Sequence, residues 1–98
     1  MTVDKLTPIT EENLLKEVKT AIKMEGNDYN DGTITVWINS IKQDLLYAGV
    51  SQAVADSTCA VGCIAQGVDD IWVSHRGAYS DLFYQGVERL RNTTLKEG

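Results

Sequence analysis

The segment from Asp28 to Val50 constrains the fold more than any other part of this chain. Its apolar residues recur at spacings of four, three, four and three, at Ile34, Ile38, Ile41, Leu45 and Ala48. This is the period of one face of an α-helix, and Trp37 widens the stripe. A helix this long with a single apolar side must lie against other helices, so the segment predicts an all-α architecture.

Both ends of the segment carry helix-boundary signals. Asp28 is a candidate N-cap, and Asp31 lies in the first turn, where a carboxylate interacts favourably with the helix dipole. Gly49 lies where helices commonly end in a left-handed residue. A strand over residues 33–38 is the alternative, because these residues are largely β-branched and alternate. The helix explains the same residues and continues beyond them, so we expect a helix at about 29–48.

Similar signals predict three further helices, at about 11–24, 54–75 and 81–91. Thr10 and Ser80 are candidate N-caps of the first and last. Glycines within the third, Gly62 and Gly67, are expected to allow close approach to a neighbouring helix, in the same chain or in the next subunit. The prediction is a small bundle of about four helices with a core of Leu14, Val18, Ile34, Trp37, Ile38, Ile41, Leu45, Ile64, Val68, Ile71, Leu82, Phe83, Val87 and Leu90.

Length and charge limit the classes of protein to consider. The 98 residues predict a single domain, 1–98, with flexible ends at about 1–9 and 92–98. The net charge of −5 disfavours a grip on nucleic-acid phosphates. No run approaches the roughly 18 apolar residues of a membrane span, and the first residues lack the apolar region of a signal peptide. Cys59 and Cys63 are expected to be reduced, since their spacing is not that of a disulfide framework.

Few residues could form a catalytic or metal site. His75 is the only histidine, and no nucleophile-elbow glycines surround Ser74 beside it. Cys59, Cys63 and His75 fall short of the four ligands of a structural zinc site. We therefore expect no catalytic residues, no metal, no cofactor and no enzymatic activity.

Three segments, taken in order, carry a family resemblance. They are L-L-K-E-V-K-T-A-I-K at 14–23, the acidic turn D-Y-N-D at 28–31, and S-D-L-F-Y-Q-G-V-E-R-L-R at 80–91. In the family that they resemble, the first segment corresponds to a short opening helix, the second to an acidic turn that leads into a long helix, and the third to the final segment. Over about residues 10–92, the chain resembles the head–tail connector (adaptor) proteins of tailed bacteriophages.

The resemblance implies a structural protein of the virion neck, made in the cytoplasm of the bacterial host. Members of the family form homo-oligomeric rings, usually of twelve subunits, beneath the portal protein at the head vertex. The ring extends the DNA channel and docks a stopper or tail-completion protein. DNA is expected to pass without specific binding, because a channel lined with net negative charge does not hold phosphates tightly. No membrane and no cofactor is implied.

Contacts with neighbouring subunits or with the portal are expected on the outer side of the long helix and towards the C-terminal end. Cyclic head-to-tail assembly needs two different complementary surfaces on each subunit. Tyrosine is favoured at interfaces, and the end of the chain is mildly basic. The candidate contact residues are Asn39, Lys42, Gln43, Tyr47, Tyr79, Arg89, Arg91 and Lys96. Residues 50–56 and 92–98 are the segments expected to refold on assembly.

A small acidic helical regulator or inhibitor, of the antitoxin or DNA-mimic type, is the alternative function. Proteins of this type are acidic, which agrees with the net charge of −5 of this chain. It predicts a concentrated acidic surface, however, whereas the acidic residues of this chain are scattered over caps and helix ends.

Overall fold

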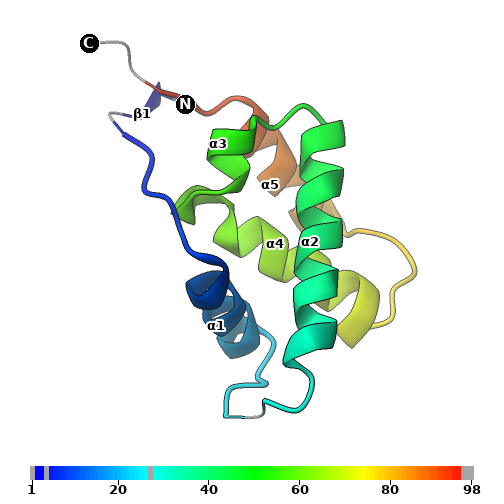
Figure 1. The fold of residues 1–98 in the computed structure, drawn as a ribbon. Helices are drawn as coiled ribbons and strands as arrows, with labels where there is room; N and C mark the ends of the chain where they lie inside the picture. Colours follow the sequence, from blue (N-terminus) through cyan, green and yellow to red (C-terminus); the bar gives the residue numbers. More distant parts are fainter. Residues whose placement is uncertain (1, 4, 27, 96–98) are drawn as a thin grey trace.

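Helices carry the fold in the computed structural model, which describes residues 2–3, 5–26 and 28–95 (Figure 1). The predicted small all-α bundle is confirmed. In chain order the elements are β1 (Thr2–Val3), α1 (Glu11–Ala21), α2 (Asp31–Tyr47), α3 (Gln52–Ala55), the 3₁₀ turn η1 (Thr58–Ala60), α4 (Val61–Val68), the π-helical turn η2 (Asp69–Val73), α5 (Asp81–Arg91) and β2 (Thr94–Leu95). The two short strands pair in parallel, which brings the two ends of the chain together.

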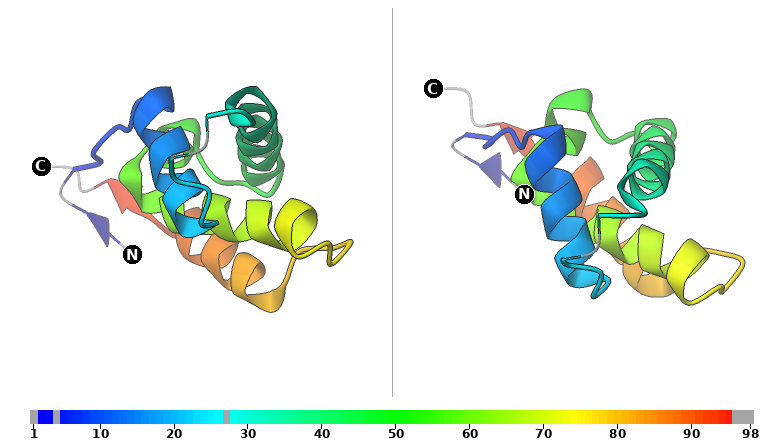
Figure 2. Two further views of the ribbon diagram at one scale, coloured as in Figure 1. Left: turned by 90° about the horizontal axis from the view of Figure 1, so that it is seen from below. Right: turned by 60° about the horizontal axis from the view of Figure 1, so that its bottom comes forward.

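The centre of the bundle is α4, which packs against α1, α2 and α5. Both views in Figure 2 show α4 lying between α1 and α5, with α2 beside them. Ile64 and Val68 of α4 are fully buried, as are Val18 of α1 and Ile34 and Ile41 of α2. Each such side chain contributes about 1.5–3 kcal/mol when it leaves water, so this contact supplies much of the stability of the domain.

The long helix α2 forms close to its predicted bounds and excludes the strand alternative for residues 33–38. Its start differs from the prediction. The N-cap is Asn30, whose side chain makes no capping bond, while Asp28 pairs with Lys19 of α1. Gly49 has φ +98°, which confirms a left-handed residue just beyond the helix. Thr10 and Ser80 cap α1 and α5 as predicted.

The prediction of one helix over residues 54–75 is wrong, because the chain breaks after α3. The Ser57 hydroxyl donates to the Val54 carbonyl at 2.7 Å and accepts from the Cys59 amide at 3.2 Å. Ser57 itself is extended, with φ −104° and ψ 168°. A serine that bonds its neighbours in this way competes with the helical hydrogen bonds and starts a new turn. The long helical unit therefore begins at η1 and continues through α4 and η2.

The N-terminal segment, expected to be a loose lead-in, contacts the domain at this same break. The Ile9 amide donates to the Asp56 carbonyl at 3.0 Å, and the Thr58 amide donates to the Thr7 carbonyl at 2.8 Å. Ile9 and Leu6 pack against the core. These bonds satisfy backbone groups that the interrupted helix leaves without helical partners.

The predicted core positions lie inward with one correction, at Leu82. Its side chain is 63% exposed. In α5 the buried side chains are Phe83, Val87 and Leu90, at spacings of four and three, and Leu82 lies about 100° away from Phe83 around the helix. Trp37 and Ile71 are half-buried. The fully or nearly buried predicted positions are Leu14, Val18, Ile34, Ile38, Ile41, Leu45, Ile64, Val68, Phe83, Val87 and Leu90.

Gly67 of α4 marks a close approach within the chain. A Cβ at this position would lie 2.8 Å from Phe83 Cε1 of α5 and 2.9 Å from Ile41 Cδ1 of α2. Gly62, by contrast, has no such neighbour within 4 Å. The interpretation of a helical glycine as a contact point within the chain thus holds for Gly67 and not for Gly62.

Replacing the two glycines by alanine should therefore have opposite effects. We expect Gly67→Ala to lower the free energy of unfolding by about 1–3 kcal/mol, because its methyl group overpacks the crossing. Gly62→Ala should raise it by about 0.5–1 kcal/mol, because alanine loses less backbone entropy in a helix. Urea unfolding of both variants measures the difference. A Gly67→Ala variant as stable as the wild type would show that α4 can move away from its neighbours at little cost.

Candidate functional site

The outward side of α2 carries no charged residue. Its exposed positions recur at helical spacing, opposite the buried Ile34, Ile38, Ile41 and Leu45. Every residue of α2 is described, and the exposed ones are Gly32, Thr33, Val36, Asn39, Ser40, Gln43 and Tyr47. These seven residues are referred to below as the uncharged face of α2. From Gly32 to Tyr47 it extends about 22 Å along the helix.

The N-terminal charge of α2, on Asp31, is turned into the domain. The Lys19 ammonium lies 2.8 Å from Asp31 Oδ1 and 2.9 Å from Asp28 Oδ1, and the Lys19 side chain is only 9% exposed. Hydrogen bonds to Asp31 and Asp28 raise the pKa of Lys19 above its ordinary value, against the opposing effect of burial. The Lys19 cation thus joins α1 to the start of α2.

Lys42, a predicted contact residue, also points back into the domain. Its ammonium forms an ion pair with Asp56, which follows α3. The hydrogen bond from Lys42 lowers the pKa of Asp56, an effect that burial opposes and the Gln52 amide reinforces. This pair ties the middle of α2 to the end of α3, so Lys42 is engaged within its own chain.

Asp44, the third charged residue of α2, accepts a hydrogen bond from the Tyr79 hydroxyl. Burial raises the pKa of Tyr79, and the bond to Asp44 raises it further. The Tyr79 ring stacks on Phe83, with centroids 3.9 Å apart, and meets Tyr84 edge to face. Tyr79, predicted to contact another subunit, is therefore used to hold α5 against α2.

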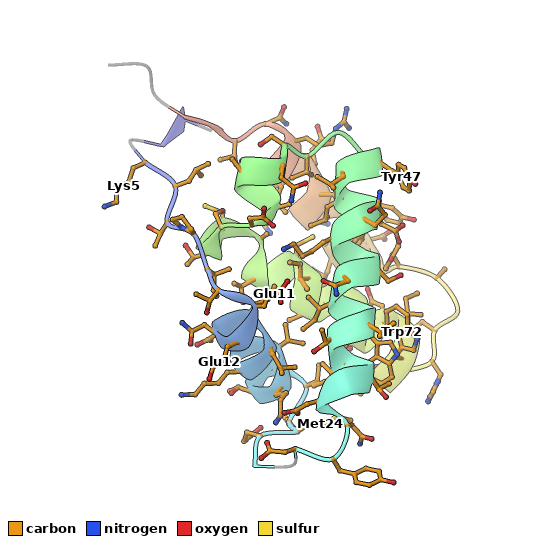
Figure 3. All side chains as sticks on the ribbon, in the orientation of Figure 1. Lys5, Glu11, Glu12, Met24, Tyr47 and Trp72 are labelled. Carbon is orange, nitrogen blue, oxygen red and sulfur yellow. The ribbon has the colours of Figure 1, made fainter. Side chains whose placement is uncertain are left out.

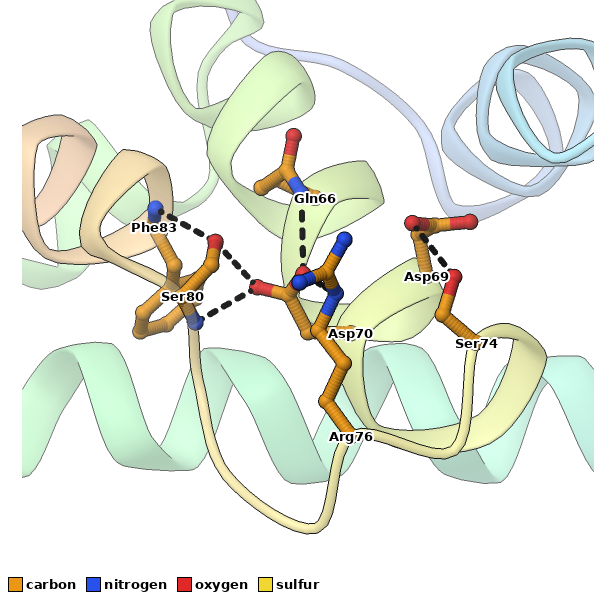
Figure 4. A network of polar contacts seen from close by, with 7 residues as sticks. All are labelled: Gln66, Asp69, Asp70, Ser74, Arg76, Ser80 and Phe83. Atoms are coloured by element: carbon orange, nitrogen blue, oxygen red, sulfur yellow. Dashed lines mark hydrogen bonds and ion pairs between the residues drawn. The ribbon is translucent and has the colours of Figure 1, made fainter.

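The turn that carries Tyr79 is fixed by the fully buried Asp70 (Figure 4). The Asp70 carboxylate accepts from the Ser80 amide at 2.9 Å, the Ser80 hydroxyl at 2.7 Å and the Gln66 amide at 3.0 Å. Arg76 Nε lies 3.4 Å away. Burial alone would raise the pKa of Asp70, but these hydrogen bonds and the Arg76 charge outweigh it and lower the pKa.

The uncharged face shares two features with protein interfaces, the lack of charge and an exposed tyrosine. The solvent side of a helix normally carries charged residues, and 23% of this chain is charged. Centres of interfaces are depleted of charge and enriched in tyrosine. Val36 is 66% exposed and Tyr47 is 81% exposed. Figure 3 shows Tyr47 pointing away from the domain near the C-terminal end of α2. The arrangement can bind another protein surface without trapping an unpaired charge.

The structure brings only some of the predicted contact residues together. Asn39, Gln43 and Tyr47 lie on the uncharged face. Arg89 and Arg91 are exposed on a different helix, α5, where Arg91 lies 3.5 Å from Glu88. Lys96 lies outside the residues that the structure describes.

Sequence reasoning missed Val36, Thr33 and Ser40 as members of this face. The signal was present, because these positions alternate with the core stripe at the same helical period. What was not visible was that Asp31, Lys42 and Asp44, at the flanks of the helix, each have a partner inside the domain.

Other kinds of site find little support in the described part of the chain. No group of three or more His, Cys, Asp or Glu side chains there is arranged to hold a metal ion. Both cysteines are free, and burial raises the pKa of the Cys63 thiol to about 11. Among the described residues, no helix combines the length and the hydropathy needed to cross a bilayer.

Comparison of the chain with known protein families, with characterised proteins and with solved structures finds no match.

Acid should weaken the Asp70 network in a predictable direction. Because the pKa of Asp70 is lower in the folded protein than its ordinary value of 3.8, its contribution is complete above that pH and is lost as the pH falls through the folded value. We expect Asp70→Asn to cost about 2–3 kcal/mol at pH 7, and to show a smaller further loss on acidification than the wild type.

Asp69→Asn is the matched control, since Asp69 is only half-buried and bonds the exposed Ser74 hydroxyl. Denaturant unfolding between neutral pH and pH 3 compares the three proteins. Equal pH dependence in the wild type and Asp70→Asn would mean that Asp70 does not hold the turn.

Proposed function

We propose that this protein is a subunit of a homo-oligomeric ring in the neck of a tailed bacteriophage. In this role it is a head–tail connector that lies beneath the portal, extends the DNA channel and docks a stopper or tail-completion protein. The proposal rests on the resemblance of residues 14–23, 28–31 and 80–91 to that family. The observation that carries it is the uncharged face of α2.

Electrostatics favours contact between copies through this face. Each copy carries a net charge of −5, so like copies repel one another at long range. A surface without charges can be covered by another copy without like-charge contacts and without desolvating an ion. The acidic excess then stays on the remaining surface. Where that surface lines a channel, negative charge keeps DNA phosphates from binding tightly.

The alternative of an acidic inhibitor draws less support from the positions of the carboxylates. A DNA mimic must present its acidic groups to the partner. Asp31, Asp56 and Asp70 are instead bonded to cationic or polar side chains of the same chain. They are spread over three different parts of the domain, so they do not form one acidic surface.

A charge placed on the uncharged face should prevent assembly without unfolding the subunit. Val36→Lys puts an ammonium where a neighbouring copy would cover it, so we expect loss of rings on the portal protein from the same genome. The free energy of unfolding should change by no more than about 0.5 kcal/mol, since Val36 is exposed. Light scattering and native mass spectrometry of the chain mixed with that portal measure the assembly.

Thr20→Lys is the matched control. Thr20 is also β-branched and exposed, but lies on α1, and the change in charge is the same. We expect this variant to assemble as the wild type does. Rings that form equally well with Val36→Lys would contradict a role of this face. A wild-type chain that does not bind the portal, and instead binds a toxin or a DNA-binding enzyme as a monomer, would support the alternative function of an acidic inhibitor.

A further inference from the structure

A second open surface lies between α4 and α5. It is a groove of about 500 Å³. Residues of both helices line it, among them Gly62, Gln66, Leu82, Gly86 and Arg89, and Cys59 of η1 lies at its edge. This surface is referred to as the α4–α5 groove. It includes no residue of α2, so it is distinct from the uncharged face.

The floor of the α4–α5 groove is made of small residues. A Cβ on Gly86 would lie 3.0 Å from Cys63 Sγ, so α5 approaches α4 closely at this point. Gly62 has open space in front of it. Leu82, 63% exposed, adds an apolar wall. A groove with a low floor and an apolar wall suits the side of a helix, in the helix-in-groove mode of recognition.

The groove and the uncharged face of α2 match in charge. Of the described residues that line the groove, Arg89 alone is charged, and its long side chain can keep its guanidinium in water while its stem packs. The uncharged face has no charged side chain that would be buried without a partner. Burying one against the other therefore desolvates no unpaired ion, which is the main penalty for wrong contacts.

The two surfaces also match in length. The groove extends from Leu82 in α5 to Thr93, which lies two residues beyond the end of that helix, and on α2 the two large exposed hydrophobic side chains are Val36 and Tyr47. Val36 and Tyr47 are about 16 Å apart along α2, and the helical part of the groove wall, from Leu82 to Arg91, is about 14 Å long. The two surfaces are therefore of comparable length.

We propose that the α4–α5 groove of one subunit receives the uncharged face of α2 from a second copy. The inference rests on the proposed ring function and specifies its subunit contact. Because the two surfaces are different parts of the same subunit, the contact is heterologous and can be repeated from copy to copy. If the rotations between successive copies add up to one full turn, the repeated contact closes into a ring.

Cys59 supplies a natural probe of this contact, since it is an exposed free thiol at the groove. In the test, the full-length Gln43→Cys variant is oxidised under two conditions. The first is free in solution at about 1 mM, a concentration at which even weak association populates the complex. The second is after assembly on the portal. We expect a disulfide between the introduced thiol of one copy and Cys59 of the next, mapped by peptide mass spectrometry. Adding Cys59→Ser or Leu82→Lys to this variant should abolish it.

Glu17→Cys, on the exposed side of α1, is the matched control and should give no link to Cys59. Links only between two introduced Gln43→Cys thiols would reveal a symmetric contact and overturn the proposal. Absence of any link under both conditions, or a link from Cys59 to the portal instead, would overturn it too.

The same samples separate this inference from the proposed function. Rings that assemble on the portal without the link to Cys59 leave the connector function standing and refute the groove as the subunit contact. A link to Cys59 in a chain that never binds the portal supports the subunit contact and refutes the connector.

Discussion

The crossing at Gly67 positions the rest of the domain. Because this residue has no side chain, α4 reaches both Ile41 of α2 and Phe83 of α5 at one level. Packed interiors have little free volume, so a displacement here moves both neighbouring helices. The α4–α5 groove has a low floor because α5 approaches α4 closely at Gly86. The α4–α5 groove therefore depends on small residues at the contact between these helices.

The uncharged face is the result of where the charges of α2 are directed. Its core stripe fixes one side of the helix inward. Asp31, Lys42 and Asp44 lie at the flanks, and each reaches a partner on another element. These contacts join α1, α3 and the turn before α5 to the long helix. They also leave its outer side free of charge, so the interactions that stabilise the subunit prepare the surface proposed to join it to others.

Local patterns predicted the parts of the fold that local physics determines. The period of α2, the caps at Thr10 and Ser80 and the left-handed Gly49 were all visible in the sequence. The break at Ser57 was not predicted, although the Ser57 hydroxyl bonds only its near neighbours Val54 and Cys59. The backbone groups at the break are satisfied by Thr7 and Ile9, which lie far away along the chain. Three of the seven residues of the uncharged face were predicted. Asn39, Gln43 and Tyr47 followed from the helical period, whereas the partners of Lys42 and Tyr79 required the tertiary structure.

A helix side without charges has a consequence for behaviour in salt. Dissolved ions screen the repulsion between acidic copies, but they have no ion pairs to weaken across such a surface. Within the subunit, salt screens the exposed ion pair of Arg91 and Glu88. If copies associate through the outer side of α2, as proposed, that association would strengthen as ionic strength rises, the reverse of the behaviour of an assembly held by salt bridges.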